Sequence, residues 1–102
     1  MAETALKGRV AVITGASLGI GRATAIAMGR AGAAVVVNYR SHREQAEEVV
    51  QAVRQCGAKA IAVQGDVADQ AAVEGLIAKA VAEFGKVDIA VSNAAYSDRE
   101  LF

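Results

Sequence analysis

Proline and tryptophan are absent from this 102-residue chain, aromatic residues make up 4% of it, and Cys56 is its one cysteine. A chain without proline is poorly suited to a polyproline or loop-built architecture. A single cysteine forms neither an internal disulfide bond nor a cysteine-based metal site. We therefore expect no bound metal and a reducing, cytoplasmic setting.

An excess of charge of one sign is also missing, because 11 Lys and Arg residues balance 11 Asp and Glu residues. Nucleic acids and anionic membranes attract proteins mainly through a net basic surface, so neither is an expected partner. The longest apolar run, Ala33 to Val37, is far shorter than the roughly 20 residues of a membrane-spanning helix. With 54% hydrophobic residues, positions 1–102 are expected to pack as one soluble domain.

Short apolar runs alternate with longer amphipathic stretches along the chain. The runs predict buried strands at 10–13, 35–37, 60–63 and 87–91, and the stretches predict helices at 20–31, 44–55 and 70–84. With right-handed crossovers, this order predicts an α/β fold with a Rossmann-like, doubly wound parallel sheet. If the last strand returns beside the first, a ligand crevice opens at the carboxyl end of the first strand.

The helix boundaries are marked by their own residues. Gly32, Gly57 and Gly85 directly follow the three helices, where a left-handed cap residue is favoured. The spacing of Ser41 and Glu44 predicts a capping box before the second helix. In the first helix, the apolar residues expected to share one side are Ile20, Ala23, Ala27 and Met28.

A glycine-rich loop, Thr14-Gly-Ala-Ser-Leu-Gly-Ile-Gly21, joins the first strand to the first helix. Glycines there allow a sharp turn and the approach of a pyrophosphate, and the helix N-terminus offers free N–H groups. No Gly-Lys-Ser/Thr follows, which argues against a nucleoside triphosphatase. Asn38-Tyr39-Arg40 lacks the carboxylate that an adenosylmethionine site needs. The loop therefore favours a dinucleotide site, with a mere tight turn as the alternative.

Three motifs in order carry a family resemblance: the glycine loop, Gly65-Asp66-Val67 after the third strand, and Asn93-Ala94-Ala95 after the fourth. From Lys7 to about Tyr96 the chain resembles the short-chain dehydrogenase/reductase family. Residues 35–41 also look like bacterial glucose dehydrogenases and 3-oxoacyl-carrier-protein reductases. The resemblance implies that the glycine loop holds the cofactor pyrophosphate, through Gly15, Ser17, Leu18, Gly19, Ile20 and Gly21.

The resemblance also implies roles for the two later motifs. Asp66 would accept a hydrogen bond from the adenine amino group, and Val67 would lie beside the ring. Asn93 would tie the fourth strand to its neighbours, and Ala94 would lie against the adenosine ribose. A solvated turn residue at Asp66 and a strand-end cap at Asn93 are the alternatives. The family usually has glycine where this chain has Ala95, so the added methyl group is expected to alter the active-site floor.

The choice between NADP and NAD depends on the residues that follow the second strand. NAD needs an acidic residue for its ribose hydroxyl, and NADP places a phosphate there that arginine can hold. In the resemblance the position of the acid is Tyr39, followed by Arg40 and by Ser41 as a second phosphate donor. NADP is therefore preferred. NAD use stays possible, because many NADP-preferring members carry a basic residue where this chain has Leu18.

The catalytic Tyr-x-x-x-Lys pair of the family is not found, since Tyr39 is followed four residues later by Arg43, and Tyr96 by Glu100. We name no catalytic residue. The hypothesis is that the chain is a fragment holding the cofactor-binding half of an oxidoreductase, which transfers hydride between a nicotinamide and a carbonyl or alcohol substrate. The complete enzyme is expected to form homo-oligomers. A dinucleotide-binding module without chemistry and an inactive truncation product are the alternatives.

Overall fold

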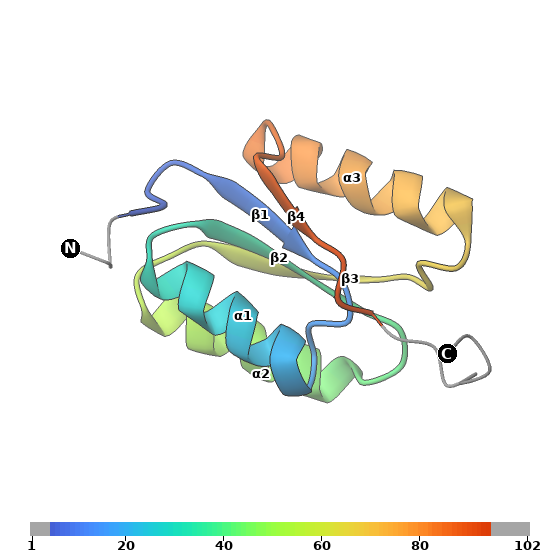
Figure 1. The fold of residues 1–102 in the computed structure, drawn as a ribbon, viewed down its shortest axis with the longest axis horizontal. Helices are drawn as coiled ribbons and strands as arrows, with labels where there is room; N and C mark the ends of the chain where they lie inside the picture. The colour runs from blue at the N-terminus through green and yellow to red at the C-terminus, as the bar shows by residue number, and fades with distance from the viewer. Residues whose placement is uncertain (1–4, 95–102) are drawn as a thin grey trace.

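The computed structural model describes residues 5–94, which form a parallel sheet between two layers of helices (Figure 1). The strands are β1 (Val10–Ile13), β2 (Ala34–Tyr39), β3 (Ala60–Gln64) and β4 (Ile89–Val91). The helices are α1 (Gly19–Arg30), α2 (Arg43–Gln55) and α3 (Gln70–Phe84). Strands and helices alternate along the chain as the sequence pattern predicts.

Within these residues the strand order is β3-β2-β1-β4, and every pairing is parallel. The order in which strands are added to the sheet therefore reverses after β3, because β4 pairs with β1. In the register, Ile13 at the end of β1 lies opposite both Val37 and Val91. The predicted doubly wound sheet is confirmed, and its switch point lies at the carboxyl end of β1.

Both faces of β1 are buried, because helices cover the sheet on each side. Figure 1 shows α1 and α2 on one side of the sheet and α3 on the other. Ile13 belongs to the core shared with α1 and α2, whereas Val12 packs with Leu76 and Ala80 of α3. A strand that points into two cores has no position for a polar residue, which explains its Val-Ala-Val-Ile sequence.

The buried side of α1 differs from the prediction. Ile20 is 78% exposed, and the buried residues of this helix are Gly21, Ala25 and Gly29. The physical reason is close packing, since a Cβ atom at Gly29 would come within 2.7 Å of the Val53 side chain of α2. The helix therefore packs against its neighbours through its smallest residues, and the positions of its large apolar residues do not indicate which side is buried.

The helix ends confirm one prediction and correct another. Gly32, Gly57 and Gly85 all have left-handed backbone conformations, as predicted. The capping box before α2 is wrong, because the N-cap is His42 and no side chain caps this helix. A real side-chain cap occurs at α3, where the Asp69 carboxylate accepts a hydrogen bond from the Ala71 N–H at 3.0 Å.

None of the helices in residues 5–94 is long and apolar enough to cross a membrane. The same residues contain no group of three or more His, Cys, Asp or Glu side chains placed to hold a metal ion.

Candidate functional site

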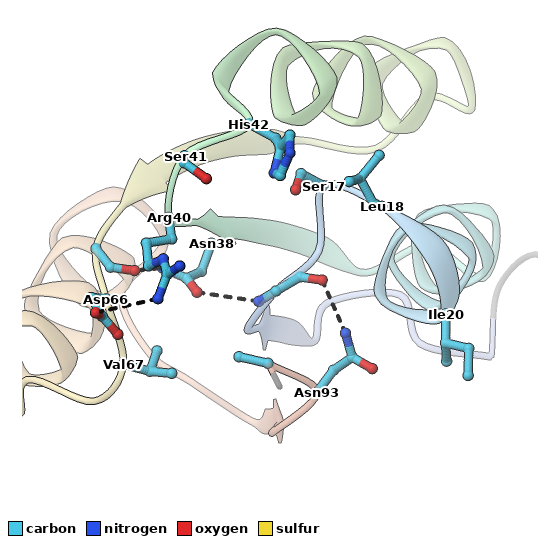
Figure 2. Close-up of a pocket in the computed structure, with 13 residues that line it drawn as sticks. Ser17, Leu18, Ile20, Asn38, Arg40, Ser41, His42, Asp66, Val67 and Asn93 are labelled. Carbon is cyan, nitrogen blue, oxygen red and sulfur yellow. Dashed lines mark hydrogen bonds and ion pairs between the residues drawn. The ribbon is translucent and has the colours of Figure 1, made fainter. Parts of the chain in front are cut away.

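A pocket of about 410 Å³ lies where the carboxyl ends of the four described strands meet (Figure 2). Its lining comes from the segments that follow β1, β2, β3 and β4, so it occupies the predicted crevice. The residues that line it are Gly15, Ser17, Leu18, Ile20, Asn38, Arg40, Ser41, His42, Gly65, Asp66, Val67, Asn93 and Ala94.

The glycine loop is held on one side by the end of β2. The Gly15 N–H donates to Asn38 Oδ1 at 3.2 Å, and the Ala16 N–H donates to the Asn38 carbonyl at 2.9 Å. Asn38 itself is 2% exposed. Buried amide groups stabilise a structure only when they are paired, so these bonds define the path of the loop.

On its other side the loop is held by the segment after β4. The Asn93 side-chain amide donates to the Gly15 carbonyl at 2.9 Å. The backbone N–H groups of Asn93 and Ala94 donate to Thr14 Oγ1 at 2.9 and 3.0 Å. The Asn93 side chain thus ties the end of β4 to its neighbour, and Thr14 completes the connection.

Two glycines of the loop are required by close contacts. Gly15 has a φ of +60°, and a Cβ atom added there would lie 2.8 Å from the Cα atom of Ala94. A Cβ atom at Gly21 would overlap the Gly15 carbonyl oxygen and the Asn93 side-chain amide. These glycines therefore allow the loop, the start of α1 and the end of β4 to meet without a gap.

The N-terminus of α1 is left without a cap. The Leu18 backbone is extended, no side chain caps the helix, and its first turn contains no acidic residue. The first N–H groups of a helix have no partner within it, and they carry the positive end of the helix dipole. Beside them, Leu18 is 46% exposed, and both Leu18 and Ile20 line the pocket. Open N–H groups next to apolar side chains fit a dinucleotide pyrophosphate.

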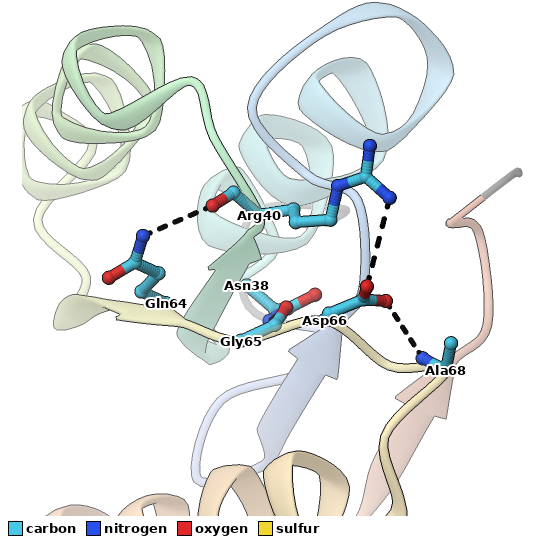
Figure 3. Close-up of polar contacts among 6 residues, drawn as sticks. All are labelled: Asn38, Arg40, Gln64, Gly65, Asp66 and Ala68. Atoms are coloured by element: carbon cyan, nitrogen blue, oxygen red, sulfur yellow. Dashed lines mark hydrogen bonds and ion pairs between the residues drawn. The ribbon is translucent and has the colours of Figure 1, made fainter. Parts of the chain in front are cut away.

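An arginine and an aspartate that both line the pocket form an ion pair (Figure 3). Arg40 Nη1 lies 3.7 Å from Asp66 Oδ2, and the two side chains are 61% and 45% exposed. Asp66 Oδ1 also accepts a hydrogen bond from the Ala68 N–H at 2.9 Å. Asp66 therefore both stabilises the turn and lines the pocket. A role in the turn, which is one interpretation made from sequence, does not conflict with a role as an adenine acceptor, which is the other.

Most of the predicted cofactor residues come together in this pocket, and three of those that the structure describes do not line it. Gly19 and Gly21 shape the loop from outside the lining, Tyr39 is buried in the core shared with α1 and α2, and Ala95 lies outside the described residues. Sequence reasoning did not place Asn38 or His42 in the site, and it gave Gly65 no role beyond its motif. A polar residue at the end of an otherwise apolar strand was the available signal for Asn38.

Comparison with known proteins agrees with this geometry. A sequence model described as short chain dehydrogenase matches residues 9–102. The chain belongs to the short-chain dehydrogenase family. Members of this family are oxidoreductases, and the Rossmann-like fold, the glycine loop and the crevice are those expected for their cofactor-binding portion.

Two of the curated relatives that match the chain are each 52% identical to it. One is an uncharacterized oxidoreductase of Methylorubrum extorquens, matched over 86% of this chain and 36% of the relative. The other is versicolorin reductase stcU of Emericella nidulans, matched over 87% of this chain and 34% of the relative. The chain therefore spans about a third of the length of these relatives.

Solved structures of the family share the fold. A hydroxysteroid dehydrogenase from Escherichia coli has a TM-score of 0.85 at 38% identity, covering 94% of this chain and 40% of that one. A dehydrogenase from Burkholderia cenocepacia with bound NADP has a TM-score of 0.83 at 39% identity, covering 87% and 35%. Identity at this level supports the family as well as the fold.

Proposed function

We propose that the pocket binds the adenosine and pyrophosphate part of NADP, with NAD as a second cofactor, and that the full-length protein is an NAD(P)-dependent oxidoreductase. The observation that carries this proposal is the uncapped N-terminus of α1, which opens into a pocket lined by the glycine loop. A family relative crystallised with NADP supports it.

Each part of the pocket has a role in this proposal. The backbone around Gly15, with Ser17, Leu18 and Ile20, holds the pyrophosphate at the start of α1. Asp66 accepts a hydrogen bond from the adenine amino group, Val67 covers the ring, and Ala94 lies against the adenosine ribose. When bound, the nicotinamide supplies or accepts the hydride. The described residues bind and orient the cofactor, while Asn93 keeps the floor of the site joined to the glycine loop.

Arg40 and Ser41 are the residues that we propose to select NADP. The guanidinium group of Arg40 is 61% exposed at the rim of the pocket, and Ser41 follows it there. Tyr39, at the position where NAD-dependent members carry an acid, is buried and offers no carboxylate. A 2′-phosphate would therefore meet a hydroxyl group and the Arg40 guanidinium, which also pairs with Asp66, and no acid follows β2 to repel it.

The substrate class that we propose is a small molecule with a carbonyl or alcohol group. Relatives named versicolorin reductase and hydroxysteroid dehydrogenase are consistent with this class. We also propose that the full-length protein is a homo-oligomer.

The test is a titration of the full-length protein and its Arg40→Asp variant with NADPH and NADH. The substitution replaces phosphate attraction by repulsion and supplies an acceptor for the ribose hydroxyl. The ratio of the Kd for NADPH to the Kd for NADH should therefore rise by about a hundredfold. Arg43→Asp is the control, because it makes the same charge change at a residue that does not line the pocket.

Three results are distinguishable. An unchanged ratio in Arg40→Asp would remove Arg40 from the cofactor site. Failure of the wild-type protein to bind either nucleotide would contradict the proposed function as a whole. Binding without turnover of any carbonyl or alcohol substrate would favour a dinucleotide-binding module.

A further inference from the structure

One buried polar side chain in the pocket wall makes three hydrogen bonds. Asn38 is the second-last residue of β2 and is 2% exposed. Its Oδ1 atom accepts from the Gly15 N–H at 3.2 Å. Its Nδ2 atom donates to the Val63 carbonyl at 3.3 Å and to the Gly65 carbonyl at 3.1 Å. Both donors and the acceptor of the amide are thus used.

The partners of Asn38 belong to two different parts of the pocket. The side-chain oxygen of Asn38 accepts from Gly15 in the glycine loop, and Figure 3 shows Asn38 beside Gly65, directly before Asp66. The backbone follows the same pattern, because Ala16 donates to the Asn38 carbonyl at 2.9 Å and Gly65 donates to the Tyr39 carbonyl at 2.9 Å. The end of β2 therefore connects the loop proposed for the pyrophosphate to the turn proposed for the adenine.

We propose that Asn38 is a positioning residue that couples the glycine loop to the Gly65-Asp66 turn, so that both are in register for a dinucleotide. This proposal rests on the proposed function. Asn38 acts through the backbone of Gly15 and Gly65. Disturbing it on the Gly65 side should therefore weaken phosphate binding at the glycine loop as well.

The chemistry of the amide explains why the closely similar aspartate would not serve. In Asn38→Asp the new carboxylate would still accept from Gly15, but it would place a negative oxygen against the carbonyl oxygens of Val63 and Gly65. Burial and these neighbours would raise the pKa of that carboxyl group. Once protonated, it would regain one donor and resemble the asparagine.

The experiment compares binding of ADP and AMP to full-length wild type, Asn38→Asp and Asn38→Leu, at about pH 8 and about pH 5.5. The ratio of the two affinities isolates the contribution of the second phosphate. A partly unfolded sample lowers both affinities equally and leaves the ratio unchanged. The wild type, which has the same His42 and Asp66 side chains in the pocket, is measured with the same nucleotides at the same pH values as the reference. Val53→Ala is the control for lost stability, because Val53 is fully buried and does not line the pocket.

We expect the ADP-to-AMP affinity ratio to fall about tenfold in both Asn38 variants at the higher pH. It should recover at the lower pH in Asn38→Asp alone, and it should stay at the wild-type value in Val53→Ala. An unchanged ratio in Asn38→Asp at the higher pH, or a pH-independent loss in that variant, would overturn the coupling even if Asn38→Leu failed to fold. Absence of ADP binding by the wild type would instead remove the proposed function.

Discussion

The loop between β1 and α1 and the turn between β3 and α3 make the same strand-to-helix connection by different means. The β3–α3 turn is stabilised largely from within, because Asp66 accepts from Ala68 and Asp69 accepts from Ala71, each two residues along the chain, and Asn38 adds one bond to the Gly65 carbonyl. The β1–α1 loop is instead held from a distance, by Asn38 after 23 positions and by Asn93 after 78.

The difference lies in what each helix N-terminus must do. A carboxylate cap accepts from the Ala71 N–H at the start of α3, and its charge would also repel a phosphate there. The α1 N-terminus has no such cap, so its loop needs other support. The neutral side-chain amides of Asn38 and Asn93, from neighbouring strand ends, supply this support and add no negative charge to the pocket. A loop that binds an anion is therefore expected to be anchored by distant residues.

The largest effect should come from adding one methyl group at the start of α1. In Gly21→Ala the new Cβ atom would overlap the Gly15 carbonyl and the Asn93 amide, which are the two partners of one anchoring hydrogen bond. We expect the free energy of unfolding to fall by about 3 kcal/mol and nucleotide binding to be lost. Denaturant unfolding and NADPH titration of the full-length protein measure the two effects.

The matched control for this change is Gly75→Ala in α3. A Cβ atom there meets nothing within 4 Å, and Gly75 lies in a helix interior. Alanine should therefore raise the unfolding free energy by about 0.5–1 kcal/mol and leave NADPH affinity unchanged. Equal effects of the two substitutions would show that the contacts at Gly21 are not what the loop depends on.

The next largest effect should come from giving α1 the kind of cap that α3 has. Leu18 is already the N-cap residue and has the extended backbone that capping residues prefer. In Leu18→Asp the carboxylate would accept from the first N–H groups of α1 and repel a pyrophosphate. NADPH affinity should fall about a hundredfold, while the unfolding free energy stays constant or rises by up to about 1 kcal/mol.

The opposite substitution completes this test. Asp69→Ala removes the α3 cap and should lower the unfolding free energy by about 1 kcal/mol without changing NADPH affinity. Loss of affinity in Asp69→Ala, or unchanged affinity in Leu18→Asp, would contradict the division between a binding helix end and a structural one.

The fold could be predicted from sequence because it follows from local patterns. Apolar runs such as 10–13 are typical of strands buried on both faces, and glycines such as Gly85 end helices through their own backbone conformation. The glycine loop could be found for the same reason, because its motif is contiguous. In each case the prediction depends only on residues that are close together in the sequence.

The rest of the site depends on contacts between distant segments. Asn38 could be seen as a polar residue at a strand end, but its bonds to Gly15 and Gly65 follow only once three strand ends are aligned. The inner side of α1 was mispredicted because steric fit at Gly29 against Val53 outweighs hydrophobicity. The expected cap at Ser41 was wrong because Ser41 to Glu44 matches the pattern of a capping box, whereas the N-cap of the helix is the following residue, His42.

The smallest effect of a substitution is expected at the end of the sheet opposite the pocket. There the carboxylate of Asp88 joins β4 to β1, as the amides of Asn38 and Asn93 join segments at the pocket. Asp88 Oδ2 accepts from the Val10 N–H at 2.8 Å and lies 3.2 Å from Lys86 Nζ. The bond from Val10 lowers the pKa of Asp88, with Lys86 and Arg9 adding to the effect and partial burial opposing it. A pKa lowered by folding stabilises the protein above the unfolded value of about 3.9, and this stabilisation is lost as the pH falls through the folded pKa.

Asp88→Asn should therefore be less stable than the wild type at neutral pH, and the gap should close below about pH 4. NADPH affinity at neutral pH should not change, because Asp88 contacts the start of β1 and does not line the pocket. Denaturant unfolding of both proteins from neutral to acidic pH measures the gap. A gap that persists at low pH would mean that Asp88 acts by packing, and its charge would then have no part in joining β4 to β1.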